Sequence, residues 1–480
     1  MFREKIDSHE RLQSRNRFLF KTLFPIIVLT LFLTFYTFST EILIITAPTP
    51  STTTTTTNNN TISDSINITF PSDSNEEKFL TYLPHSGFHN QHGALMNSIM
   101  MAYLTNRTLI LPPVLVYYYP SFNDFYTLYD KLNKTIKIKT YRMNHCSESD
   151  LLTDDDNGRI NDDNVDNIFN SQILCNKRYS KYDKFTMVDW EQIFDFSEIR
   201  KYVKMIHRGY DFSLDTLNQK FNFSKDDTFL IVEKEQYELR FYDNDDSNIS
   251  LEQFKKKILI SDLLKIDQKL LHFSSLFSHH RIKLEKEKNI NFVNLIHNKL
   301  TINNPNVLRV TDHVIKELGG KGNYFGLHIR VGDAKFRIHE GDSINIIYDE
   351  LINSLVKLDL IRDSKKFFNF NLKKCLKYNL PIIYIATDSG DPKREFVKFY
   401  NNIPCIFTLF DFTKDLENFG KISSDFDKDI DLINFYIPLM DLLITAHGGI
   451  FIGTNGSTFS RMAYEVHNLD NGKNALGHWP

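Results

Sequence analysis

The chain has 480 residues, of which 41% are hydrophobic, 40 are Phe and 22 are Tyr. This length exceeds the ~250–300 residues that one hydrophobic core serves, so we expect two folded domains with appended segments. The 57 Lys and Arg against 60 Asp and Glu give a formal net charge of −3, which argues against a dedicated nucleic-acid-binding protein, and only 4 Cys exclude a small disulfide-rich scaffold.

The N-terminus predicts a membrane anchor. Residues 22–40 are uncharged and apolar, and at 1.5 Å per residue they span ~28 Å, enough to cross a bilayer. The preceding residues 1–21 carry a basic excess, so the positive-inside rule predicts a cytosolic tail there and a luminal location for everything after the anchor. A cleaved signal peptide is the alternative, but the apolar run is long for one and no A-x-A site follows. The Thr/Ser/Asn-rich residues 41–78 predict a disordered stalk.

Two further features fit a secretory lumen. The four Cys fall two and two, and pairing within each half is the simplest of the three connectivities: Cys146–Cys175 and Cys375–Cys405. Glycosylation sequons N-x-S/T are also abundant. They begin at Asn59, Asn67, Asn106, Asn133, Asn222, Asn248 and Asn455.

Residues 79–305 are predicted as a first α/β domain. The apolar stretch Leu80–Leu83 precedes a polar Gly-containing loop at 85–93, a helix at 94–106 and a strand at 108–114 that ends at two prolines. This order is a βαβ unit. Residues 251–300 have a helical composition. Loop-forming residues at 301–307 then predict a domain boundary before a new strand.

Residues 306–480 are predicted as a second α/β domain. Strands expected at 324–330, 382–387, 405–410 and 449–454 alternate with helices such as 433–446 and 455–467. Strict alternation predicts a parallel sheet with a ligand crevice at the carboxyl ends of its strands. Polar motifs follow three of these strands directly, so we expect them to meet in that crevice.

The first motif is HIRVGD at residues 328–333. An Arg at a strand end can present two parallel N–H groups to a phosphate, and Asp333 can orient the guanidinium of Arg330. The alternative is an ordinary ion pair between Arg330 and Asp333.

The second motif is GTNGSTFSR at residues 453–461, where a Gly-rich loop with hydroxyls opens a helix. Backbone N–H groups and the helix dipole make such a loop an anion site, and Ser457 or Thr458 can equally serve as a helix N-cap. The third motif is ATDS, in which Asp388 can hold a ribose hydroxyl or a base N–H, or can cap the helix that begins near Pro392.

The fourth motif is the loop HSGFHNQHG at residues 85–93. Its three His and two amides offer hydrogen bonds or a base, and its glycines allow close approach to a sugar phosphate. Loop His residues with no Cys nearby argue against a zinc site, so we expect no bound metal. The alternative is a turn that packs the following helix.

Taken in order, the segments SGFHNQHGALMNSIMMAYLTNRTLILPP, HIRVGD, YIATDS and FIGTNGSTFSRMAYEV resemble the GDP-fucose protein O-fucosyltransferase family, and most of all its fungal, N-terminally anchored members. The likeness covers residues 79–117 and 324–467. It implies a GT-B fold, in which two Rossmann-like domains face a central cleft. It also implies a glycosyltransferase that moves fucose from GDP-fucose to a protein or glycan hydroxyl, with inversion and without a required cofactor or metal, in the Golgi or ER as a single-pass type II membrane protein.

The resemblance also assigns roles. Arg330 matches the Arg on the donor β-phosphate, His328 a His near the guanosine or pyrophosphate, and Asp388 an Asp on the nucleoside. The other matching positions belong to the phosphate and base loop and to the N-terminal loop over the fucose and pyrophosphate. They are Ser457, Thr458, Phe459 and Ser460 in the former and Gly87, Phe88, Asn90 and Gln91 in the latter.

The catalytic base stays open. Some relatives place a Glu in the N-terminal loop, whereas residues 85–93 contain no carboxylate. Either His85 or His89 takes that role, or departure of GDP leads and no side chain acts as base.

Two other functions compete with this reading. A metal-dependent GT-A enzyme needs a D-x-D motif, and such motifs occur at 154–156 and within 425–431 in acid-rich runs that follow no apolar strand. A catalytically inactive, membrane-anchored sugar-binding protein would keep the fold without turnover.

Overall fold

The computed structural model describes residues 77–147, 172–332, 334–338, 340–360, 370–417, 419–471 and 476–478. The predicted tail, the anchor, nearly all of the stalk and Asp333 lie outside these residues. Within them, no helix combines the length and the hydrophobicity that a membrane crossing requires. Residues 74–480 form one compact unit.

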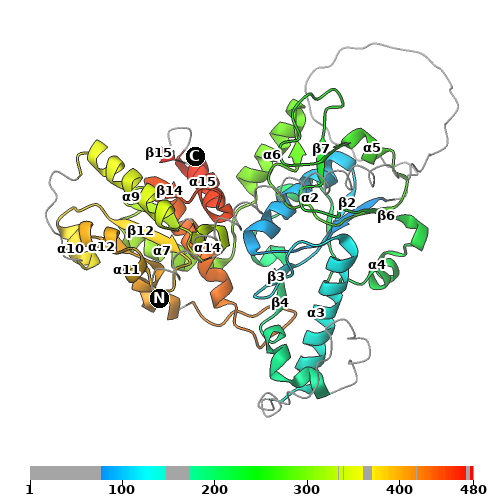
Figure 1. Ribbon diagram of the computed structural model, residues 1–480, viewed down its shortest axis with the longest axis horizontal. Coiled ribbons are helices and arrows are strands. Elements are labelled where there is room, and N and C mark those ends of the chain that lie inside the picture. Colours follow the sequence, from blue (N-terminus) through cyan, green and yellow to red (C-terminus); the bar gives the residue numbers. More distant parts are fainter. Residues whose placement is uncertain are drawn as a thin grey trace, which may run out of the picture. The chain divides into compact units, whose positions relative to one another are not determined.

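The first sheet is parallel, with strand order β5-β2-β1-β9-β6 (Figure 1). Its strands are β1 (Phe79–Tyr82), β2 (Thr108–Leu111), β5 (Met205–His207), β6 (Thr228–Ile231) and β9 (Leu270–Phe273). The helices of this half are α2 (Phe88–Thr105), α3 (Phe125–His145), α4 (Leu214–Phe221), α5 (Ile260–Leu264) and α6 (Glu287–Lys299). The predicted βαβ unit is therefore present as β1-α2-β2, and β2 ends directly before the two prolines.

Smaller sheets extend this half. The strands β7 (Leu239–Tyr242), β8 (Lys256–Leu259) and β10 (Ile282–Lys283) form one, and β3 (Val114–Val116) pairs antiparallel with β4 (Thr186–Val188) in the other. The helical prediction for residues 251–300 was wrong except at α5 and α6. Propensity favoured a helix there, but β8 pairs with β7 and β9 pairs with β1 and β6, and tertiary pairing overrides local preference.

The second sheet is also parallel, in the order β13-β12-β11-β14-β15. Its strands are β11 (Phe325–Ile329), β12 (Ile383–Thr387), β13 (Ile406–Phe407), β14 (Ile450–Gly453) and β15 (Leu476–His478). The helices of this half are α7 (Pro305–Glu317), α8 (Ala334–Ile338), α9 (Glu340–Lys357), α10 (Leu372–Lys377), α11 (Pro392–Glu395), α12 (Val397–Asn402), α13 (Thr413–Glu417), α14 (Ile433–Ala446) and α15 (Thr458–Asn471). The predicted parallel α/β sheet is confirmed.

A helix comes first in this half, where a strand was expected. The loop-like residues 301–307 contain the start of α7, because Asn304 caps the helix through its side chain and Pro305 occupies the first turn, where a missing N–H costs nothing. The chain passes from one sheet to the other between β10 and β11. The domain boundary near residue 305 stays a prediction.

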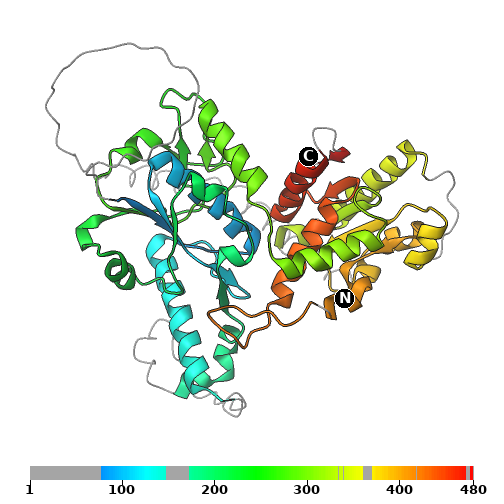
Figure 2. The ribbon, with the colours of Figure 1, turned by 180° about the vertical axis from the view of Figure 1, so that it is seen from behind.

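Helices cover both faces of the second sheet. Alternate residues of β11, Phe325, Leu327 and Ile329, pack with α9 in one buried cluster, whereas α14 packs against β11 and β12. Figure 2 shows α7 and α14 together in the view from behind. Gly326 faces α14, and a Cβ at this residue would lie 2.0 Å from the Thr445 carbonyl oxygen. The absence of a side chain at residue 326 thus sets how closely α14 approaches the sheet.

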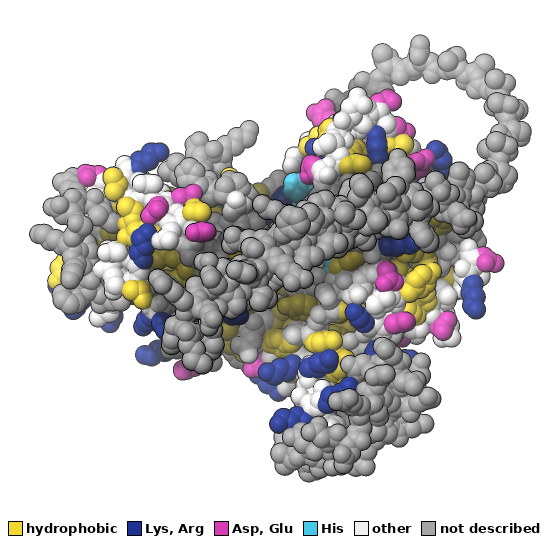
Figure 3. Space-filling model, in the orientation of Figure 1, with side chains coloured by type: hydrophobic (Ala, Val, Ile, Leu, Met, Phe, Trp, Pro, Cys, Tyr) yellow, Lys and Arg dark blue, Asp and Glu magenta, His cyan; other side chains and the backbone are white. Residues whose placement is uncertain are grey.

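Both predicted disulfides are confirmed. Cys146 is bonded to Cys175, and Cys375 to Cys405. Each closes a loop of about thirty residues, which corresponds to ~3 kcal/mol of stabilisation in the chain-entropy model. In the face seen in Figure 3, Lys and Arg as well as Asp and Glu are spread over the described surface, in agreement with the small net charge.

Candidate active site

A pocket of about 810 Å³ lies at the carboxyl ends of β11 and β12. Parallel α/β sheets bind ligands at this edge, because strand ends and helix N-termini converge there. The start of α15, residues 434–441 of α14 and the first turn of α2 also line the pocket, as do β3 and residues of three loops of the first half of the chain. All four sequence motifs therefore contribute residues to the lining of this one pocket.

Arg330 lies directly after β11 and lines this pocket. Its Nη1 is 3.0 Å from Oδ2 of Asp388, and its side chain is about one-third exposed, so the guanidinium is oriented while part of it faces the pocket. The Arg330 backbone N–H donates to Oγ1 of Thr454 (2.9 Å), which ties β11 to the end of β14. The ion-pair partner predicted from sequence, Asp333, is outside the described residues.

Asp388 lies between Arg330 and the loop that follows β11. Its carboxylate accepts hydrogen bonds from the backbone N–H groups of Val331 (2.8 Å) and Gly332 (2.9 Å), besides its ion pair with Arg330. A Cβ on Gly332 would lie 2.3 Å from Oδ2 of Asp388, so a larger residue there would displace this carboxylate. The carboxylate fixes the Arg330 guanidinium and the loop after β11 as one unit, and it does not cap α11, whose N-cap is Asp391.

His328 and Phe459 form the inner wall. Their rings stack with centroids 4.1 Å apart, and Nδ1 of His328 lies 2.6 Å from Oγ of Ser460. Burial lowers the pKa of His328 well below its ordinary value, and the charge of Arg330 adds to this, so the imidazole is neutral at pH 7. Ser460 itself does not line the pocket, and its role is to hold His328.

The start of α15 combines both predicted roles. Oγ of Ser457 accepts the Ser460 N–H (3.4 Å) as a helix cap, and Gly456, Ser457 and Thr458 line the pocket. Unpaired backbone N–H groups of a first helical turn attract anions. The N-terminal end of α15 thus lies in the same pocket as the Arg330 guanidinium.

The N-terminal motif is partly helical, contrary to the prediction of a loop up to residue 93. Helix α2 begins at Phe88 with Gly87 as N-cap, so His89, Asn90 and Gln91 occupy its first turn. Gly87, Phe88, His89 and Asn90 line the pocket. Gln91 does not, because its amide is occupied: it accepts the Leu115 N–H and donates to the Leu115 and Ser86 carbonyls.

The two candidate bases lie in different places. His85 is buried away from the pocket lining, with Nδ1 2.8 Å from Oγ of Ser86 and Nε2 2.8 Å from Oγ of Ser275. His89 lines the pocket, and its Nε2 is buried with no hydrogen-bond partner among the described residues. Burial and the charge of Arg330 lower the pKa of His89 to about 3, which makes it a neutral hydrogen-bonding group at pH 7.

Asp441 is a pocket residue that sequence reasoning missed. It lies on α14, where its Oδ1 accepts a hydrogen bond from the Tyr384 hydroxyl, and it lines the pocket. Burial raises the pKa of Asp441 to about 7. The available signal was one carboxylate inside the otherwise apolar run INFYIPLMDLLITA.

Metal ligands are not concentrated in this pocket. Among the described residues, one group of three potential ligands occurs, His313, Glu317 and Asp415, and none of them lines the pocket. The D-x-D residues within 425–431 do not line it either, and Asp427 forms a buried ion pair with Lys139. The motif at 154–156 lies outside the described residues.

The chain matches the family model of GDP-fucose protein O-fucosyltransferases over residues 173–469, more than half of its length. The chain belongs to this family. Membership makes it a fucosyltransferase by class. The matched residues include Arg330, Asp388 and the start of α15, whereas the N-terminal motif precedes them.

Individual relatives are distant. A short stretch of 39 residues is 56% identical to O-fucosyltransferase 30 of Arabidopsis thaliana and spans 8% of each chain. The solved structure of POFUT1 in complex with GDP-fucose is 11% identical over 85% of this chain and 98% of its own, with a TM-score of 0.36. The α-1,6-fucosyltransferase NodZ, co-crystallized with GDP, is 13% identical over 81% of this chain and 92% of its own, also with a TM-score of 0.36.

Proposed function

We propose that this protein transfers fucose from GDP-fucose to a hydroxyl of a glycan or protein acceptor, with inversion and without a metal. The observation that carries the proposal is Arg330, held by Asp388 in the same pocket as the N-terminus of α15. In this proposal residues 79–305 and 306–480 are the two Rossmann-like domains of a GT-B-like fold, and the second one holds the donor.

The diphosphate occupies the site formed by Arg330 and α15. As the bond from the sugar C1 to the β-phosphate oxygen breaks, its electron pair leaves with GDP. The Arg330 guanidinium and the N–H groups at 457–460 stabilise that charge, as preorganised donors do. The acceptor hydroxyl oxygen forms the new bond to C1, and its proton ends on an oxygen of the departing diphosphate. Nε2 of His89 forms a hydrogen bond with the groups that react at C1.

Inversion is supported by the state of the carboxylates. A double displacement needs a side chain that attacks C1, and both oxygens of Asp388 are already bound to Arg330, Val331 and Gly332. The second carboxylate of the described pocket lining, Asp441, binds the guanine base in this proposal. A single displacement by the acceptor needs no such group, and it inverts the anomeric centre.

The guanine base binds near Asp441 in this proposal. A carboxylate can accept the two adjacent N–H donors of guanine, N1–H and the 2-amino group, which adenine and uracil do not present together. The stacked His328 and Phe459 rings lie in the same pocket and offer an apolar face.

The direct test is a screen of nucleotide sugars by thermal shift on residues 79–480, followed by a transfer assay in EDTA. A GDP-fucose response and full activity in EDTA are expected. A response to another nucleotide sugar overturns the donor assignment, and activity that requires Mn²⁺ supports a GT-A-like mechanism. Donor binding without hydrolysis or transfer supports the inactive sugar-binding protein.

Donor affinity should fall at acid pH. Asp441 is ionised above its pKa of about 7 and protonated below it, so the fraction able to accept both guanine N–H groups decreases as the pH falls. Between pH 8 and pH 6 we expect the Kd for GDP to rise about tenfold. Calorimetric titration of the wild type and of Asp441→Asn measures this. The variant should bind weakly at both pH values, and an equal pH effect in the variant would assign the titration to the nucleotide phosphate instead.

The protein is further proposed to be a single-pass type II membrane protein of the Golgi or ER, with residues 41–480 in the lumen. Expressed in a host that N-glycosylates, the full chain should shift on a gel after endoglycosidase treatment. Asn455→Gln should leave that shift unchanged, because Asn455 adjoins pocket residue Gly456 and we expect it to stay unmodified. An unshifted wild-type band would contradict the luminal location.

A further inference from the structure

One wall of the pocket takes no part in the proposed donor site. It is formed by loops of the first half of the chain, and its members include Tyr119, Gln236, Tyr237 and Phe277. None of these side chains carries a charge. Tyr119 and Gln236 are exposed, and Tyr237 and Phe277 are half-buried with ring centroids 5.9 Å apart. The wall therefore offers aromatic faces with an amide and phenolic hydroxyls around them.

The backbone of Tyr237 is strained. Its φ is +65°, in the left-handed region that bulky side chains rarely adopt. Such a conformation persists only where the surrounding structure over-determines it, and it is often found at ligand sites.

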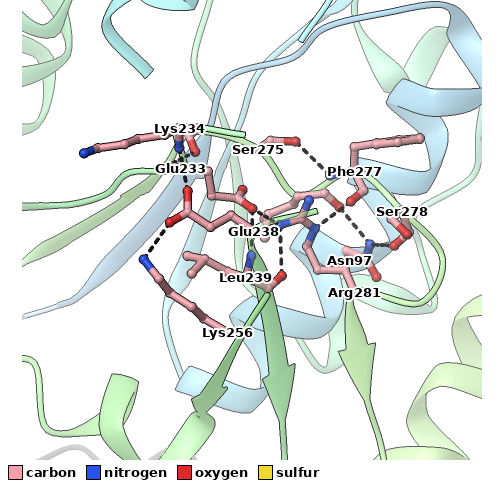
Figure 4. Close-up of polar contacts among 12 residues, drawn as sticks. Asn97, Glu233, Lys234, Glu238, Leu239, Lys256, Ser275, Phe277, Ser278 and Arg281 are labelled. Carbon is pink, nitrogen blue, oxygen red and sulfur yellow. Dashed lines mark hydrogen bonds and ion pairs between the residues drawn. The ribbon is translucent and has the colours of Figure 1, made fainter. Parts of the chain in front are cut away.

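A network of hydrogen bonds holds the turn that carries Gln236 and Tyr237 (Figure 4). The Glu238 carboxylate closes the turn: its Oε2 accepts the Lys234 N–H (2.6 Å) and its Oε1 binds Nζ of Lys256 (2.7 Å). Immediately before the turn, Oε1 of Glu233 accepts the Leu239 N–H (3.1 Å). Both ends of the turn are thereby fixed by carboxylates.

A buried ion pair links this turn to the loop that carries Phe277. Nη1 of Arg281 lies 2.6 Å from Oε1 of Glu233, and the two side chains are 0% and 2% exposed. Nε of the same guanidinium donates to the Phe277 carbonyl (2.6 Å; Figure 4). Desolvating two charges is costly and is tolerated only with good geometry, so the pair sets a single arrangement of Tyr237 relative to Phe277.

We propose that Tyr237, Gln236 and Phe277 form a rigid acceptor platform that binds a neutral sugar ring, so that the acceptor of this fucosyltransferase is a glycan. This inference rests on the proposed function. A pyranose presents an apolar C–H face, which packs on an aromatic ring, and a rim of hydroxyls, which hydrogen-bond to amides and phenols. The uncharged wall selects neither an acidic nor a basic peptide.

The reaction at the platform is the transfer described above. A hydroxyl oxygen of the bound sugar forms the bond to C1 of fucose. The bond from C1 to the β-phosphate oxygen breaks with its electrons on GDP, which also takes up the hydroxyl proton. Donor hydrolysis, in which water replaces the sugar, does not use the platform and therefore reports on the donor site alone.

The experiment compares acceptors and Tyr237 variants on the full chain. The wild type is offered neutral oligosaccharides and, separately, unglycosylated Ser/Thr peptides, with GDP release in the absence of acceptor as the donor-only measure. We expect transfer to oligosaccharides and none to the peptides. For Tyr237→Ala we expect the acceptor KM to rise about tenfold or more, while donor hydrolysis and the donor KM change less than twofold.

Two further variants test the aromatic ring of Tyr237 separately from its positive φ. Tyr237→Phe keeps the aromatic face but loses the phenolic hydroxyl, so its acceptor KM should lie between those of the wild type and Tyr237→Ala. Tyr237→Gly removes the ring but suits a φ of +65°, so it should be as poor in acceptor KM as the Ala variant without a lower melting temperature. Tyr126→Ala, which removes a 61% exposed Tyr outside the pocket, is the matched control and should change nothing.

The outcomes distinguish this inference from the proposed function. Transfer to peptides but not to oligosaccharides overturns the glycan assignment and leaves the fucosyltransferase standing. An unchanged acceptor KM in Tyr237→Ala overturns the platform. A wild-type protein that neither hydrolyses GDP-fucose nor transfers fucose overturns the proposed function itself.

Discussion

Arg330→Ala is expected to lower the rate of fucose transfer by ~10²–10³, the usual effect of removing one preorganised donor from a developing negative charge. Arg330→Lys should fail nearly as badly. Lys keeps the charge, but it cannot make two parallel N–H···O bonds, and it cannot reproduce the planar contact of the guanidinium with Asp388. The measurement is kcat/KM for GDP-fucose in both variants.

A purely structural role for Arg330 predicts different effects of the Lys and Ala substitutions. If its ion pair with Asp388 only closed a strand end, a partly exposed pair would contribute ~0–1 kcal/mol, Lys would restore the function and even Ala would be mild. Arg394→Lys is the matched control, because Arg394 is an exposed Arg on α11 that also pairs with an Asp and does not line the pocket. Melting temperatures verify that each variant folds. A folded Arg330→Lys protein with near wild-type transfer would refute the donor assignment.

Gly326→Ala is expected to have the largest effect on folding. The new methyl group would lie 2.0 Å from the Thr445 carbonyl oxygen and 2.8 Å from its carbon, both in the backbone of α14. Neither β11 nor α14 can move without disturbing the second sheet, so we expect a loss at the upper end of the 1–3 kcal/mol typical of overpacking. This corresponds to a melting temperature lower by ~5 °C or more. Thermal denaturation of residues 74–480, the compact unit, measures it.

The same substitution should also weaken the donor site, because β11 carries His328 and leads into Arg330. Gly341→Ala is the matched control: this Gly lies in α9, where a Cβ meets nothing within 4 Å, so the change should be neutral or slightly stabilising. A Gly326→Ala protein as stable as Gly341→Ala would show that α14 is not seated on β11 as described.

Much of the second half of the chain was predictable from its sequence. Helix α14 has the predicted bounds, and β11, β12 and β14 agree to within a residue or two. These elements have strong periodicity, and Pro, Gly or polar motifs end them. Because parallel strands end at one edge of their sheet, the sequence alone predicts that the motifs at Arg330, Asp388 and Ser457 lie together.

The first half was predicted less well. Residues 251–300 contain helix-forming residues, yet β8 and β9 are strands because partners distant in the chain pair with them. The bounds of α2 were also missed, since Gly87 caps a helix whose first turn is polar because it faces the pocket. Local composition carries no information on either point.

The sequence by itself predicted an α/β sheet in each half of the chain, the simplest pairing of the four Cys and the family to which the chain belongs, because these follow from periodicity, spacing and motif order. Tertiary structure alone decided the environment of each group. It gave Arg330 the partner Asp388, took His85 and Gln91 out of the pocket lining and brought Asp441 into it. It also gave Tyr237 a positive φ, in a turn that a buried ion pair links to the loop of Phe277. The physical reason is that burial, pKa and backbone strain depend on neighbours far apart in the chain, and no local pattern encodes them.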